Sequence, residues 1–112
     1  MLFIDTDDNI LLTRGDTATL NISITDSEGN PYTMQEGDTL KFSIKRIYTE
    51  PEVLLELVVT EPVVHLASAD TDNLSFGVYH YDVVFINDSI VDTIIADKTF
   101  TVGYEVHELG GE

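Results

Sequence analysis

The sequence has no cysteine, and this absence excludes several kinds of chemistry at once. Without thiols the chain has no disulfide framework, no thiolate zinc site and no cysteine nucleophile. Tryptophan is absent as well, and no uninterrupted apolar run approaches the ~20 residues of a membrane span. The first eight residues contain neither a basic segment nor a long apolar stretch, so we expect no secretion signal there.

Basic residues are the second shortage, with five lysines and arginines against 21 aspartates and glutamates. The resulting formal charge of −16 repels nucleic-acid phosphates and anionic membrane surfaces, and the chain has no basic stripe. We therefore expect no nucleic-acid partner and no membrane partner. The same charge favours a protein that stays soluble until it meets a specific partner.

The length and composition fit one globular domain. With 112 residues, of which 43% are hydrophobic and 23% charged, the chain can bury a single hydrophobic core. We predict one β-sandwich domain over residues 1–108. The glycine-containing segment 109–112 is expected to be a flexible C-terminal tail.

Alternation of apolar and polar residues with a period of two predicts strands along the chain. The most strand-like run follows Gly77, where Tyr79, Tyr81, Val83 and Phe85 share one face. Other predicted strands, of varying regularity, are Phe3–Asp5, Ile10–Thr13, Thr17–Thr25, Thr39–Ile47, Val53–Thr60, Val63–Leu66, Ile90–Ile95 and Thr99–Val106. The segment 68–73 is expected to be a polar crossover that leads into the Tyr79 strand.

Turn signals separate these strands, and no helical periodicity of useful length occurs, which favours a sandwich over an α/β arrangement. Leu74, Gly77 and Tyr79 have the spacing of a tyrosine corner, in which a tyrosine near the start of a strand bonds back across the preceding loop. We predict an all-β fold, an antiparallel Greek-key immunoglobulin-like β-sandwich. The predicted core consists of Leu20, Ile22, Ile24, Phe42, Ile44, Tyr79, Tyr81, Val83, Phe85, Phe100 and Val102.

The three histidines, His65, His80 and His107, do not stand in a pattern with metal-site spacing. His65 and His80 alternate with core-facing residues, so we expect both to point outward. The sequence also lacks a nucleophile-elbow glycine pattern and a phosphate-binding glycine loop. We predict no catalytic residue, no cofactor and no enzymatic activity.

Two groups of acidic and amide residues carry the oxygen ligands that calcium takes. They are Asp5, Asp7, Asp8 and Asn9, and Asp70, Asp72 and Asn73. Neither group follows the EF-hand loop, and Asp and Asn are ordinary turn residues, so we predict solvated turns without a metal. Arg14-Gly15-Asp16 is the tripeptide that integrins read, but glycine between two polar residues is also what a tight turn needs, and we predict a turn.

The outward faces of the predicted strands carry apolar residues that one small sandwich leaves uncovered. Leu54, Val58, Val84 and Ile86 form the candidate interaction surface, because exposed apolar patches usually mark partner contacts. The alternative is that a loop or a terminal segment of the chain covers them.

Five segments carry a resemblance to a known family. They are Asn9–Thr17, Asp26–Tyr32, Gly37–Lys45, Gly77–Val83 and Phe100–Val102. Their order resembles that of the immunoglobulin-like domains of tailed-phage structural proteins, in particular the N-terminal domain of the baseplate upper protein of phages that infect Gram-positive bacteria. The resemblance implies a non-enzymatic virion component of the baseplate, tail, neck or head, made in the bacterial cytoplasm. Its implied partners are other virion structural proteins, or further copies of itself in a homo-oligomer.

The competing class is a bacterial carbohydrate-binding or adhesive β-sandwich module. Such modules generally expose aromatic rings that stack on sugars, whereas this chain has no tryptophan and most of its Tyr and Phe residues fall on predicted core faces. This distribution favours the virion protein.

Overall fold

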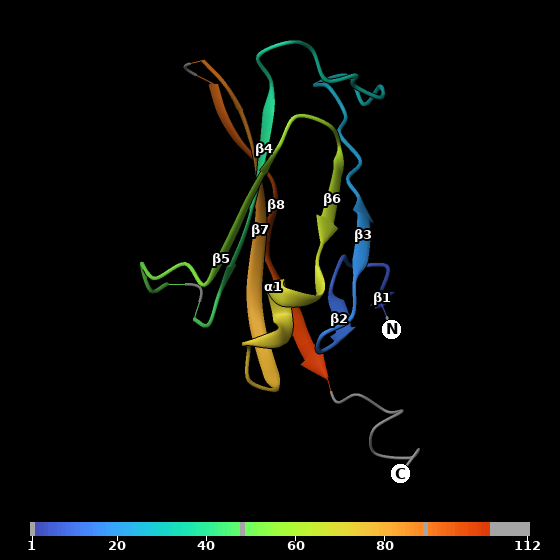
Figure 1. The fold of residues 1–112 in the computed structure, drawn as a ribbon. Helices are drawn as coiled ribbons and strands as arrows, with labels where there is room; N and C mark the ends of the chain where they lie inside the picture. The colour runs from blue at the N-terminus through green and yellow to red at the C-terminus, as the bar shows by residue number, and fades with distance from the viewer. Residues whose placement is uncertain (1, 48, 89, 104–112) are drawn as a thin grey trace.

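The computed structural model describes residues 2–47, 49–88 and 90–103, and over these ranges the protein is an all-β fold with one short helix (Figure 1). The elements in chain order are β1 (Leu2–Ile4), β2 (Ile10–Thr13), β3 (Ala18–Asn21), β4 (Thr39–Lys45), β5 (Leu55–Val59), β6 (Val63–Leu66), α1 (Ser68–Asp72), β7 (Gly77–Asn87) and β8 (Ile90–Gly103). They form a six-stranded sheet with the order β1-β2-β8-β7-β4-β5 and a two-stranded sheet of β3 and β6. The all-β prediction is confirmed.

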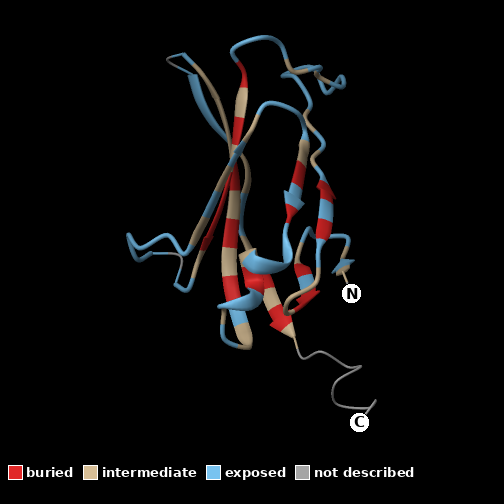
Figure 2. Cartoon of the chain, viewed as in Figure 1, coloured by how far each residue is buried: buried red, intermediate tan, exposed pale blue. Residues whose placement is uncertain are grey.

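The hydrophobic core contains residues from both sheets, and buried residues alternate with exposed ones along the strands, as Figure 2 shows. The buried apolar residues are Ile10, Leu12, Ala18, Leu20, Leu40, Phe42, Ile44, Val64, Leu66, Tyr79, Tyr81, Val83, Phe100 and Val102. Eight of the eleven residues predicted for the core are in this set. The other three, Ile22, Ile24 and Phe85, are half-buried and pack against it.

Three aromatic rings from three neighbouring strands meet in the middle of this core. The ring centroids of Phe42 and Tyr81 lie 5.4 Å apart, and Phe100 lies 6.3 Å from Phe42 and 6.4 Å from Tyr81. These separations are in the range at which aromatic pairs attract beyond the effect of area burial. The rings therefore hold β4, β7 and β8 together from the inside.

The predicted corner hydrogen bond of Tyr79 is present at the start of β7. The Tyr79 side chain is 2% exposed, and its hydroxyl donates a hydrogen bond of 2.8 Å to the carbonyl of Ser75. The guanidinium of Arg46 lies over the same ring, 5.0 Å from its centroid. The segment before β7 is thus tied to the strand that follows it.

The strand pairing differs from the prediction of a purely antiparallel sheet. β2 pairs with β8 in parallel, with Ile10 opposite Phe100, whereas the other pairs in the six-stranded sheet are antiparallel. The six-stranded sheet is therefore mixed. The physical reason is that only strands joined by a short hairpin have to be antiparallel. β2 ends at Thr13 and β8 begins at Ile90, so no hairpin joins them.

The strands predicted at Ile90–Ile95 and from Thr99 onward are one continuous strand, β8. Its register against β7 shifts twice between Tyr81 and Val84, so β8 contains extra residues there, and Asp97 has a φ of 47°. Such bulges bend a strand and re-aim its side chains. As a result the consecutive residues Ile94 and Ile95 both pack against the core.

The predicted strand Thr17–Thr25 is shorter in the structure and ends as β3 at Asn21. Its partner β6 begins at Val63, directly after Pro62. The carbonyl of Pro62 accepts a hydrogen bond of 2.8 Å from the N–H of Ile22, but proline has no N–H to continue the ladder. The alternation beyond Asn21 therefore produces half-buried residues without a strand.

The polar crossover predicted at 68–73 contains the five-residue helix α1. A carboxylate oxygen of Asp70 accepts a hydrogen bond of 2.7 Å from the N–H of Ala67, which stabilises the start of the helix. Residues 104–106 of the predicted final strand, His107 and the predicted tail at 109–112 lie outside the described residues.

Candidate interaction surface

The four predicted interaction residues lie on the outward side of the six-stranded sheet, which we call the outer face. Val58 and Val84 both lie opposite Lys41 in the register, one on each side of β4. Leu54 precedes β5 and shares the parity of Val58. Val58 and Val84 therefore share one face of the sheet.

The predicted residues differ in their exposure. Val58 is 60% and Leu54 38% exposed, whereas Val84 and Ile86 are half-buried. Ile86 lies opposite Val91 of β8, which is 69% exposed. We refer to Val58, Val84, Ile86 and Val91 as the Val84 patch, since Val84 lies between the others.

A second apolar group, which the sequence analysis missed, lies at the other end of the outer face. Phe3 lies opposite Leu11, and Leu11 and Val78 both lie opposite Thr101. Phe3 is 57%, Leu11 39% and Val78 52% exposed. We call Phe3, Leu11 and Val78 the Phe3 patch. It could have been found from Leu11, which lies between the core residues Ile10 and Leu12 and therefore points outward.

A polar belt separates the two patches. It contains Ser43 opposite Asp82, and Lys45 opposite His80. Burial raises the pKa of the Asp82 carboxyl, while the charges of Lys45 and Lys41 act in the opposite direction. The outer face is thus apolar at both ends and charged in the middle.

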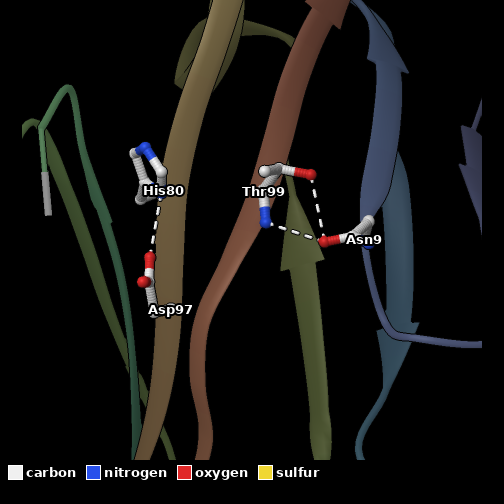
Figure 3. Close-up of polar contacts among 4 residues, drawn as sticks. All are labelled: Asn9, His80, Asp97 and Thr99. Atoms are coloured by element: carbon white, nitrogen blue, oxygen red, sulfur yellow. Dashed lines mark hydrogen bonds and ion pairs between the residues drawn. The ribbon is translucent and has the colours of Figure 1, made fainter.

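His80 faces outward as predicted, but it has a carboxylate partner that the sequence pattern did not show. Its Nδ1 lies 2.9 Å from a carboxylate oxygen of Asp97, as Figure 3 shows. The β8 bulge brings Asp97 to this place. His65, also predicted to point outward, is exposed, and its Nδ1 lies 3.2 Å from the hydroxyl of Thr19.

The acidic group at the β1–β2 connection is an internally bonded turn. One carboxylate oxygen of Asp5 accepts hydrogen bonds of 2.9 Å from the N–H groups of Asp7 and Asn9. These bonds lower the pKa of the Asp5 carboxyl, and the bond from the Asn9 backbone has the largest effect. The amide oxygen of Asn9 accepts bonds of 3.0 Å from both the N–H and the hydroxyl of Thr99 (Figure 3). The loop thereby ties β2 to β8.

The second acidic group belongs to α1, where Asp70 stabilises the helix start. Within the described residues, no three or more histidine, aspartate and glutamate side chains gather in a way that could hold a metal ion. In the same ranges, no helix is long and apolar enough to cross a membrane.

Arg14-Gly15-Asp16 forms the predicted turn between β2 and β3. Gly15 has a φ of 83°, and the N–H of Asp16 donates to the carbonyl of Thr13 over 3.1 Å. The guanidinium of Arg14 lies 4.4 Å from the centroid of the Phe76 ring. The arginine therefore packs on the protein itself, which disfavours a role in adhesion.

Asp38 was not predicted as a functional residue; it is 2% exposed and accepts three hydrogen bonds. The hydroxyl of Tyr32 donates to it over 2.6 Å and the N–H of Gln35 over 2.7 Å, and the side-chain amide of Asn87 is the third donor. The Tyr32 bond in particular lowers the pKa of the Asp38 carboxyl. The parity of Asp38 with Leu40 could have revealed it, because a carboxylate on the core side of a strand needs donors.

Asp38 is one of the residues that line a pocket of about 330 Å³, next to the connection between β7 and β8. Its apolar walls are Ile24, Phe85, Ile90 and Ile94. Its other lining residues are Thr25, Asp26, Tyr32, Asp38, Asn87 and Asp92. The rings of Tyr32 and Phe85 meet edge to face, with centroids 5.8 Å apart. We call this the Tyr32 pocket.

The fold and these surfaces define an all-β, two-sheet protein with a partly apolar outer face. No family model, no curated protein and no solved structure matches this chain.

Proposed function

We propose that the protein is a non-enzymatic structural component of a tailed-phage virion, an assembly module of the baseplate, tail, neck or head. The observation that carries the proposal is the outer face, where Val58 and Val91 are 60% and 69% exposed around the half-buried Val84 and Ile86. Apolar groups gathered on one face of a small domain favour a protein contact. The sequence resemblance supplies the virion context.

Several features support an immunoglobulin-like Greek-key sandwich as the finer description of the fold. The chain crosses between the two sheets after β2, after β3, after β5 and again after β6. β3 and β6 pair although they are not consecutive in the chain. The hydrogen bond from Tyr79 to Ser75, at the start of β7, has the form of a tyrosine corner.

The charge of the chain adds a condition to assembly. Copies that each carry a formal charge of −16 repel one another at low ionic strength, and added salt screens this repulsion. Self-association through the apolar outer face should therefore persist or strengthen as salt rises. Rings are the natural closed form, since phage parts have cyclic symmetry.

Light scattering over a range of protein and salt concentrations tests self-association, and co-purification with the products of neighbouring genes tests heterologous assembly. Val58→Glu, on the outer face, should weaken either contact at least tenfold. Asn21→Glu, an exposed position of β3 on the other sheet, is the matched control and should have little effect. A strictly monomeric protein that binds no neighbouring virion protein would contradict the proposal.

The second candidate, a carbohydrate-binding or adhesive module, is favoured by one observation. The Tyr32 pocket combines two aromatic rings with carboxylate and amide groups, which are the groups that bind sugars. However, Asp38 and the amide of Asn87 already bond to each other. A glycan array separates the classes, because specific glycan binding that Tyr32→Ala abolishes would favour the sugar-binding module.

A further inference from the structure

One edge of β8 is paired with a neighbouring strand over most of its length, whereas the other edge is paired only near its end. β8 pairs with β7 from Ile90 to Val102, but β2 occupies its other edge only from Phe100 to Gly103. Among the described residues, no strand pairs with that edge between Ile90 and Lys98. We call this stretch the open edge.

The chain itself leaves this edge open. A strand that continued β2 backwards along β8 would cover it, but the chain reverses at Asp8, whose φ is 68°, and forms β1 instead. The side-chain oxygen of Asn9 then accepts a hydrogen bond from the N–H of Thr99. The β1–β2 loop, which contains Asp8 and Asn9, thus marks the end of the open edge.

The Tyr32 pocket lies against the open edge. Ile90, Asp92 and Ile94 of β8 form one of its walls, and Ile24 and Tyr32 belong to the irregular segment that faces them. Ile90 is 57% exposed. The volume of the Tyr32 pocket, about 330 Å³, is within the ~300–1,000 Å³ of typical ligand pockets. A strand added to the edge would point alternate side chains toward this pocket.

The bulges set where such a strand can pair. Between Thr93 and Lys98 the register against β7 is irregular, which discourages pairing by an arbitrary strand. From Ile90 to Thr93 the ladder is regular. The pairing segment is therefore short, about four residues, and it lies next to the pocket.

Charge identifies the occupant. Asp26 and Asp92 line the pocket, and no lysine or arginine does. A second copy of the chain would bring another charge of −16 and a second Asp92 to the same edge. A segment with lysine or arginine complements the edge instead.

We propose that the open edge and the Tyr32 pocket bind a short extended segment of a partner protein by strand addition. The segment carries a bulky apolar residue, which enters the pocket, and flanking basic residues that pair with Asp92 and Asp26. In such complexes main-chain hydrogen bonds supply affinity and the side-chain pocket supplies specificity. The inference deepens the proposed function, on which it rests for the nature of the partner, while the binding site itself stands on the geometry of β8.

The probe is the synthetic peptide Lys-Ile-Lys-Phe-Lys-Ile-Lys with blocked ends, titrated into the full chain and followed by calorimetry and by amide NMR signals. Binding should weaken as salt rises, in contrast to self-association, because opposite charges attract. The amides from Ile90 to Thr93 should shift and exchange hydrogen more slowly. The peptide Glu-Ile-Glu-Phe-Glu-Ile-Glu, with the same apolar pattern, should bind at least tenfold more weakly.

Asp92→Lys should weaken binding of the lysine peptide at least tenfold. Glu56→Lys, an exposed position of β5 on the outer face, changes the net charge equally and should leave the affinity within about twofold. An equal loss in both variants would show a net-charge effect only and overturn the proposal. Peptide binding that does not slow amide hydrogen exchange from Ile90 to Thr93 would also overturn the proposal. Circular dichroism checks that each variant is folded.

The two proposals can fail separately. If the peptide does not bind but Val58→Glu abolishes assembly, the strand-addition site is wrong and the virion proposal stands. If the peptide binds at β8 but the protein neither self-associates nor binds neighbouring virion proteins, the virion proposal is wrong and the site stands.

Discussion

Phe42→Ala is the sharpest test of the aromatic core that β4, β7 and β8 share. The Phe42 side chain is fully buried, and its ring contacts those of Tyr81 and Phe100 at 5.4 Å and 6.3 Å between centroids. Truncation removes the buried ring and leaves a cavity, which costs about 3–5 kcal/mol for Phe→Ala in protein cores. Domains of this size have a total stability of ~5–15 kcal/mol, so the loss is a large part of it.

The assay is urea unfolding, followed by circular dichroism. With a slope of about 1–3 kcal/mol per M, the midpoint should fall by about 1 M or more. Phe3→Ala is the matched control, since Phe3 is 57% exposed. It should lower the free energy of unfolding by less than ~1 kcal/mol. An unchanged midpoint for Phe42→Ala, or an equal fall in both variants, would refute the assignment of the aromatic core.

Three further predictions concern polar groups near the core. Tyr79→Phe leaves the Ser75 carbonyl without its 2.8 Å donor and should lower the free energy of unfolding by ~1–3 kcal/mol, measured in urea. The pKa of Asp38 is lowered in the folded protein, so its carboxylate stabilises the fold above the ordinary pKa of aspartate, and this contribution is lost as the pH falls through the folded pKa. Asp38→Asn should therefore destabilise the protein at pH ~7 and less at pH ~3, and an equal loss at both values would contradict this. Burial raises the pKa of Tyr81 to about 12, so the folded protein should lose stability as the pH rises from ~10 toward that value. Tyr81→Phe should lose less stability over that range in urea unfolding at each pH.

The parts of the fold that local patterns determine were predictable from the sequence. In β4 and β7 the core-facing positions recur at every second residue, because each side chain points to the opposite face from its neighbour. Leu40, Phe42 and Ile44 of β4 and Tyr79, Tyr81 and Val83 of β7 are all apolar and buried. Tyr79 was found because the corner depends on residues only a few positions apart. The shared face of Val58 and Val84 also follows from parity within each strand.

What the sequence did not reveal depends on contacts between distant residues. Asn9 and Thr99 are 90 positions apart, and Asp38 and Asn87 are 49 apart. Neither pair has a local signal, because Asn9, Asp38 and Asn87 each resemble an ordinary turn residue and Thr99 an ordinary strand residue. The partner of His80 depends on the β8 bulge near Asp97, which no spacing rule indicates. α1 was missed because five residues are too few for a helical period to be visible.

The parallel pairing of β2 with β8 has a consequence for how the chain is made. Ile10 and Leu12 are fully or almost fully buried, yet Ile10 pairs with Phe100 and Leu12 with Val102. Ribosomes add ~5–20 residues per second, so about 5–20 s separate the synthesis of these partners. In that interval the apolar side chains of β2 have no sheet to join. Completion of β8 therefore sets the earliest moment at which the sheet can close, and the nascent chain is most prone to aggregation before that moment.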